Sequence, residues 1–114
     1  MIKVMIADDQ ELIRQSLQIV LSTHEDLKVV DAVENGFAVL ESIKKERPDV
    51  ILMDIMMPVM DGLTAARTIR DLERQDAKTI PIIAMTANAF REDAERCMEA
   101  GMNAHLAKPL DDEK

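Results

Sequence analysis

Five short apolar runs alternate with segments of helical periodicity along the chain, and this alternation restricts the possible fold more than any other feature. In the intervening segments apolar residues recur every three or four positions, as on one face of an amphipathic helix. Strands that alternate with helices predict right-handed crossovers and an α/β fold, with a parallel sheet and helices on both faces. The runs are Ile2–Ala7, Lys28–Val33, Val50–Met53, Ile80–Met85 and Ala104–Ala107.

The second run, Lys28–Val33, is more polar than the others, which places it at the edge of the predicted sheet. The central runs are apolar throughout, which is typical of strands buried on both sides. A chain of 114 residues with a hydrophobic fraction of 47% has room for one core, so residues 1–114 are expected to form one domain. The first helical segment is expected to bury a face made of Ile13, Leu17, Val20 and Leu21.

Polar residues stand directly after four of the runs, and these residues are the candidates for function. In an open parallel sheet the carboxyl ends of the strands lie along one edge, where such folds bind ligands. Three carboxylates, a hydroxyl and an ammonium are therefore expected to meet in one crevice. The residues are Asp8 and Asp9 after the first run, Asp54 after the third, Thr86 after the fourth and Lys108 after the fifth.

Three carboxylates in close proximity repel one another unless a hard divalent cation such as Mg²⁺ lies among them. A carboxylate beside Mg²⁺, with a lysine and a hydroxyl nearby, suits attack on a phosphoryl group to give an aspartyl phosphate. Each signal alone has a simpler interpretation, because Asp8–Asp9 could cap a helix, Thr86 could satisfy a turn and Lys108 could end a strand. Asp54 is harder to explain in this way, since it follows the most apolar strand, where a carboxylate needs partners.

The net charge of the chain argues against two classes of partner. At −8 it disfavours direct binding to nucleic acid or to an anionic membrane. The single Cys97 cannot form a disulfide within the chain, and it falls on the apolar side of a helical pattern. It is therefore expected to be a reduced core residue in a cytoplasmic protein. No apolar stretch approaches the roughly 18 residues of a membrane span.

With these residues placed, the chain resembles a response-regulator receiver domain, the phosphoacceptor module of two-component signalling. The resemblance covers the whole chain, and it implies a flavodoxin-like five-stranded sheet with the strand order 2-1-3-4-5. The motifs that carry it are Ile6–Asp9, Met53–Gly62, Met85–Asn88 and Gly101–Pro109.

The resemblance implies that Asp54 is the residue that becomes phosphorylated. Asp9, Asp54 and the backbone carbonyl of Met56 are expected to bind Mg²⁺, and Asp8 is expected to act mostly through a metal-bound water. The phosphodonor is expected to be a phosphohistidine on a sensor histidine kinase or on a phosphotransfer domain. The domain itself is not expected to be an enzyme, beyond catalysing its own phosphorylation and dephosphorylation.

The phosphoryl oxygens are expected to contact the Lys108 ammonium, the Thr86 hydroxyl and the Ala87 amide. In the family, a switch pairs this hydroxyl with an aromatic residue three positions before the lysine, and that position is His105 here. An imidazole can swing inward as a tyrosine does, but its charge varies near neutral pH. Phosphorylation is thus expected to change a partner-binding surface through Thr86 and His105.

The subfamily and the effector stay open. Residues Met1–Met57 resemble receivers of stand-alone DNA-binding regulators, whereas Gly62–Lys114 resembles receivers fused to hybrid kinases. The sequence stops six residues after Lys108, so the fifth helix of the family is expected to be missing or truncated. The sheet face that this helix would cover is then expected to expose apolar residues, which a homodimer would shield.

Three alternatives compete with a phosphorylated receiver. A phosphohydrolase of the haloacid-dehalogenase type needs a second Asp two residues after the nucleophile, where this chain has Met56. A flavodoxin-like electron carrier usually stacks aromatic residues on its flavin, and Phe37 and Phe90 are the only aromatic residues of the chain. A receiver that acts without phosphorylation is disfavoured by the intact acids, Thr86 and Lys108.

Overall fold

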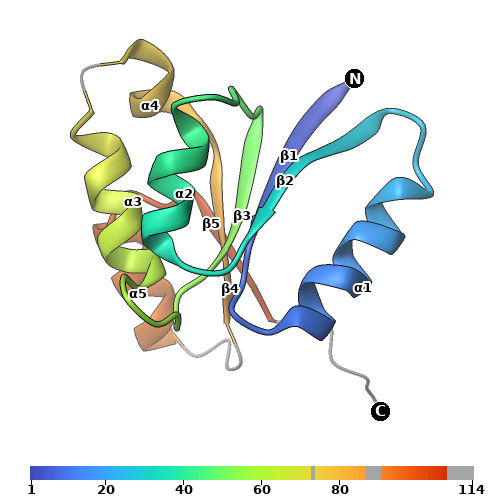
Figure 1. Cartoon of the computed structure of the whole chain (residues 1–114). Coiled ribbons are helices and arrows are strands. Elements are labelled where there is room, and N and C mark those ends of the chain that lie inside the picture. The colour runs from blue at the N-terminus through green and yellow to red at the C-terminus, as the bar shows by residue number, and fades with distance from the viewer. Residues whose placement is uncertain (73, 87–90, 108–114) are drawn as a thin grey trace.

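The computed structural model describes residues 1–72, 74–86 and 91–107. Within these ranges the chain forms a five-stranded, all-parallel sheet flanked by helices (Figure 1). The order β2-β1-β3-β4-β5 confirms the doubly wound α/β fold predicted from the sequence. The strands are β1 (Ile2–Ala7), β2 (Leu27–Val33), β3 (Val50–Asp54), β4 (Ile82–Thr86) and β5 (Ala104–Ala107). The helices are α1 (Glu11–Ser22), α2 (Gly36–Ile43), α3 (Gly62–Arg70), α4 (Gln75–Thr79) and α5 (Arg91–Glu99).

Strands β1 and β5 have the predicted boundaries, and those of the other three strands differ from the prediction by one or two residues. Strand β2 begins one residue earlier, at Leu27, and β3 ends one residue later, at Asp54. Strand β4 begins at Ile82 instead of Ile80, because Pro81 lies between them and has no N–H to donate to a neighbouring strand. The prediction that the second strand lies at the sheet edge is confirmed, since β2 pairs with β1 at one end of the order.

The short helix α4 is absent from the predicted order of elements, which has four helices where the structure describes five. With five residues, Gln75–Thr79 is too short to show a recognisable apolar period. Its Ala77 is nevertheless fully buried in the core. Packing against the rest of the molecule, rather than a local pattern, therefore defines this helix.

Helices α2, α3, α4 and α5 lie on the same face of the sheet, where their buried side chains form one cluster with those of the strands (Figure 1). Cys97 of α5 belongs to this cluster and is 1% exposed, which confirms that it is a core residue. The strand residues in the cluster are Met5, Ala7, Ile51, Met53, Ile82 and Ala84.

Helix α1 lies on the opposite face, mainly beside β2 and β1 (Figure 1). It covers Val4 and Ile6 of β1 and buries its own Ile13 there. The prediction that Val20 belongs to the buried face is wrong, because its side chain is 56% exposed. Among the described residues, no second helix packs beside α1 to cover that side.

The half of this face formed by the later strands is less well covered than the half beneath α1. Leu52 and Ile83, which are register neighbours in β3 and β4, are half-buried, and Leu106 of β5 is 53% exposed. The helix that was expected to be missing or truncated is not α5 but the one that would follow β5. That part of the chain lies outside the described residues, so this expectation stays a prediction. Among the helices that are described, none is long and apolar enough to cross a membrane.

Candidate metal centre

The carboxylates of Asp8, Asp9 and Asp54 lie together at the carboxyl edge of the sheet. Each offers an oxygen, and these oxygens are within 4.8 Å of one another. Strands β1 and β3 are neighbours with Ala7 opposite Met53, so the residues that follow these two positions are brought side by side. Asp8 is fully buried and Asp54 is 2% exposed, whereas Asp9 is exposed. The arrangement is therefore two shielded acids with one acid at the solvent boundary.

Two turns of the same kind orient the buried carboxylates. Asp8 Oδ1 accepts a hydrogen bond from the backbone N–H of Gln10 at 2.9 Å, and Asp54 Oδ1 accepts one from that of Met56 at 3.0 Å. In each case an Asp side chain binds the backbone two residues on, which is an Asx-turn. Each carboxylate is therefore held by the turn that directly follows its strand.

The loop after Asp54 returns to the strand end through Gly62. The Gly62 N–H donates to the carbonyl of Ile55 at 3.2 Å, and a Cβ at Gly62 would lie 2.3 Å from the Asp54 carbonyl oxygen. Asp61 caps α3 by accepting from the Thr64 N–H at 2.7 Å. The sequence Asp61–Gly62 thus combines a helix cap with a backbone approach that has no room for a side chain.

Val59 sits at a strained position within this loop. Its φ is 69°, and the Met60 N–H donates to the Pro58 carbonyl at 2.7 Å, which closes a three-residue γ-turn with Val59 at its centre. Positive φ is unfavourable for a β-branched residue. The Val59 side chain is 83% exposed, so its packing offsets little of the strain.

Replacing Val59 with glycine should stabilise the protein by about 1 kcal/mol. The substitution removes a backbone strain of about 1–3 kcal/mol, less the extra chain entropy of glycine, about 0.5–1 kcal/mol. Urea denaturation followed by circular dichroism would measure the change. Val20→Gly is the matched control, because Val20 is also exposed but lies within α1, where glycine should destabilise the protein. A loss of stability in Val59→Gly would contradict the strain at this position.

The other predicted site residues are only partly described. Thr86 ends β4 opposite Ala107, at the same sheet edge as the three acids. His105 lies in β5 opposite Ala84 and is half-buried. Ala87 and Lys108 fall outside the described residues, so their contacts stay predictions.

Sequence reasoning missed Arg14, whose guanidinium Nη1 donates to the Asp8 carbonyl oxygen at 2.7 Å. An arginine in the first turns of an exposed helix is common, so the sequence carries no signal for this contact. The same holds for Gly36, whose N–H donates to the Met60 carbonyl at 2.9 Å and connects α2 with the loop after Asp54. The Gly36 contact joins segments that are distant in sequence. The Arg14 contact requires the chain to turn back between β1 and α1.

The donor set fits a hard divalent cation. It consists of three carboxylates, and hard cations such as Mg²⁺ prefer oxygen ligands of this kind. A cation among them would also offset the mutual repulsion of three like charges within 4.8 Å. The residues that could hold it directly or through water are Asp8, Asp9 and Asp54.

Comparison with known families agrees with this geometry. Residues 4–114 match the sequence model of the response regulator receiver domain. The chain belongs to this family. Its parallel sheet in the order 2-1-3-4-5 is that of a receiver, and receivers act in two-component signalling.

Relatives of this receiver occur both in regulators and in kinases. The transcriptional regulatory protein CseB of Streptomyces coelicolor is 35% identical over 95% of the chain, which spans 43% of CseB. The probable histidine kinase 1 of Oryza sativa subsp. indica is 33% identical over 95% of the chain, which spans 14% of that kinase. The chain therefore spans less than half the length of these relatives.

A solved structure of similar sequence contains a metal. The receiver domain of the sensor histidine kinase PA1611 from Pseudomonas aeruginosa PAO1 superposes with a TM-score of 0.82 and 36% identity, covering 96% of this chain and 86% of that one. That structure has a magnesium ion coordinated in its active site cleft. Receivers of this family bind Mg²⁺ in the acidic pocket, and the present chain has a cluster of three acids at the carboxyl edge of its sheet.

Proposed function

We propose that this receiver takes a phosphoryl group from a phosphohistidine onto Asp54 with Mg²⁺ and thereby switches a partner-binding surface. The observation that carries the proposal is the buried Asp54 carboxylate, which shares a 4.8 Å cluster with Asp8 and Asp9. A structural role alone would leave three adjacent like charges without a purpose, two of them almost completely shielded from water. A site built to receive a cation and a phosphoryl group accounts for all three.

The proposed transfer is a nucleophilic displacement at phosphorus. An Asp54 carboxylate oxygen forms a bond to phosphorus while the P–N bond of the phosphohistidine breaks, and the imidazole nitrogen keeps the electron pair. The Met56 N–H holds Asp54 Oδ1, which orients the carboxylate for attack. Burial of Asp54 limits the access of water to the acyl phosphate that forms.

The other roles follow the expectations from the sequence. Asp8 and Asp9, together with Asp54 and the Met56 carbonyl, would hold Mg²⁺, which when bound supplies charge neutralisation for the phosphoryl oxygens. Lys108, the Thr86 hydroxyl and the Ala87 amide would contact those oxygens. Thr86 and His105 would then transmit the change along β4 and β5, which are adjacent strands.

Donor, location and assembly are part of the same proposal. The donor would be a sensor histidine kinase or a phosphotransfer domain, as expected for a receiver, and the location would be cytoplasmic. The exposed Leu106 and half-buried Ile83 favour a homodimer that shields this part of the sheet. Sedimentation of the purified chain would measure its assembly directly.

Acetyl phosphate should phosphorylate the protein only when Mg²⁺ is present. Without a cation, an anionic donor must approach three carboxylates, which repel it. Intact-mass spectrometry should show one added phosphoryl group after incubation with acetyl phosphate and magnesium chloride. Excess chelator should reduce this product to the level of an incubation without donor. Equal incorporation in chelator would contradict the proposed role of the cation.

A further inference from the structure

Arg14 holds the turn that carries two of the three acids. From α1 its Nη1 reaches back to the Asp8 carbonyl oxygen at 2.7 Å, so the side chain spans the whole turn between β1 and the helix. The Arg14 N–H also donates to the Gln10 carbonyl at 3.1 Å, as the first turn of α1 requires. Residue 14 thus bonds both ends of the turn that contains Asp9, the Asp8 end through the arginine side chain and the Gln10 end through its backbone.

The N-cap of α1 is linked to the same turn through its backbone N–H. Gln10 is the N-cap residue, and its side chain makes no capping hydrogen bond. The Gln10 N–H is bound instead by Asp8 Oδ1 at 2.9 Å, which couples the start of the helix to a carboxylate of the site. Any displacement of the Asp8 carbonyl would therefore move both the Asp8 carboxylate and the beginning of α1.

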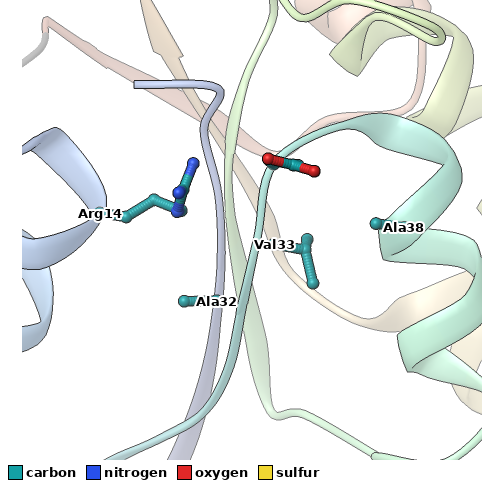
Figure 2. Close-up of a pocket in the computed structure, with 5 residues that line it drawn as sticks. Arg14, Ala32, Val33 and Ala38 are labelled. Atoms are coloured by element: carbon teal, nitrogen blue, oxygen red, sulfur yellow. The ribbon is translucent and has the colours of Figure 1, made fainter. Parts of the chain in front are cut away.

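The position of the Arg14 side chain leaves it accessible from one side. A surface pocket of about 240 Å³ is lined by Arg14 together with Ala32, Val33, Glu34 and Ala38. Figure 2 shows the Arg14 side chain extending from α1 toward the sheet, on the same side as Ala32. Truncation of Arg14 would enlarge this pocket, because the Arg14 side chain forms part of its lining.

We propose that Arg14 is a positioning residue for the metal centre. Its guanidinium fixes the Asp8 carbonyl and so pre-arranges Asp8 and Asp9 for a divalent cation. The proposal rests on the proposed function, because a pre-arranged turn matters to the reaction only if the acids bind a cation beside the phosphoacceptor Asp54.

The test is a titration of the whole chain with magnesium chloride, followed by calorimetry and by backbone amide NMR. The chain has no Trp or Tyr, so intrinsic fluorescence would not report binding. Arg14→Ala should raise the Kd for Mg²⁺ about tenfold to a hundredfold, the usual cost of losing a group that orients metal ligands. In the metal-free protein, the Gln10 amide should also exchange its hydrogen faster in the variant than in the wild type.

Two further measurements separate positioning from general damage to the fold. At saturating Mg²⁺, phosphorylation of Arg14→Ala by acetyl phosphate should return to nearly the wild-type rate, and added ethylguanidine should restore part of the lost Mg²⁺ affinity. Arg67→Ala is the control, because it removes the same charge from an exposed position on α3. It should leave the Kd for Mg²⁺ unchanged.

The outcomes distinguish this proposal from the proposed function. If Arg14→Ala folds and binds Mg²⁺ like the wild type, or if Arg67→Ala weakens binding equally, Arg14 does not position the site. If Arg14→Ala unfolds, Arg14→Lys and Arg14→Gln replace it, and lysine should retain more Mg²⁺ affinity than glutamine; equal affinity would overturn the proposal. If the wild type is not phosphorylated at all, the proposed function fails, whatever the Arg14 variants do.

Discussion

Replacing Asp54 with asparagine should abolish phosphorylation of this receiver by acetyl phosphate, down to the background measured in excess chelator. An amide has no anionic oxygen with which to attack phosphorus. Asparagine is nearly the same size as aspartate, and its Oδ1 can still accept the Met56 N–H, so the turn should be retained. The loss of product would then report the missing nucleophile rather than a collapsed site.

The same substitution should stabilise the metal-free protein. Two unit charges about 5 Å apart interact by about 3 kcal/mol at an effective dielectric constant of 20, so removing one of three carboxylates should contribute on the order of 1–3 kcal/mol. Denaturation in the presence of a chelator would measure this gain. A variant that is more stable and yet inert is the expected signature of a site whose charges serve a ligand rather than the fold.

Asp49→Asn is the matched control for both measurements. Asp49 is exposed, lies outside the acidic cluster and accepts a hydrogen bond from the Lys3 N–H at 2.8 Å. This variant should be phosphorylated like the wild type and should show no gain in stability. Undiminished phosphorylation of Asp54→Asn would mean that another residue receives the phosphoryl group.

Replacing Gly62 with alanine should destabilise the protein by about 4 kcal/mol or more, a large share of the 5–15 kcal/mol that holds a typical domain together. The added Cβ would lie 2.3 Å from the Asp54 carbonyl oxygen and 2.9 Å from the Ile55 Cα. Both contacts are with backbone, which cannot move aside as a flexible side chain would. Relief would require either the start of α3 or the end of β3 to shift.

Urea denaturation of Gly62→Ala would measure this loss, and Thr64→Ala is the control. Thr64 is exposed in the first turn of the same helix, so its truncation should change stability by no more than about 0.5 kcal/mol. Because the contact is with Asp54 itself, any folded Gly62→Ala protein should also bind Mg²⁺ more weakly. If Gly62→Ala is as stable as the wild type, the backbone around position 62 can shift at little cost in free energy, which would contradict this prediction.

Local sequence patterns determined the elements that span several turns or a whole strand. The apolar runs indicated all five strands, and the polarity of Lys28–Val33 indicated the sheet edge, because burial on one or both faces selects residue types directly. The acids at the strand ends were predicted to converge for a general reason, since parallel strands point their carboxyl ends to one edge. The strand order could not be predicted in this way. Alternation of strands and helices alone does not specify it, and it was implied only by the resemblance to receivers.

Tertiary structure alone decided the features that depend on contacts between distant segments. The short α4 packs its Ala77 into the core, and Val20 is exposed on a helix that contacts mainly the edge strand β2. The hydrogen bond from Arg14 to Asp8, the γ-turn at Val59 and the close approach of Gly62 to Asp54 leave no periodic trace in the sequence. Hydrophobic periodicity records which side of an element is buried, averaged over many residues, whereas the geometry of a site depends on single atoms that the completed fold brings together.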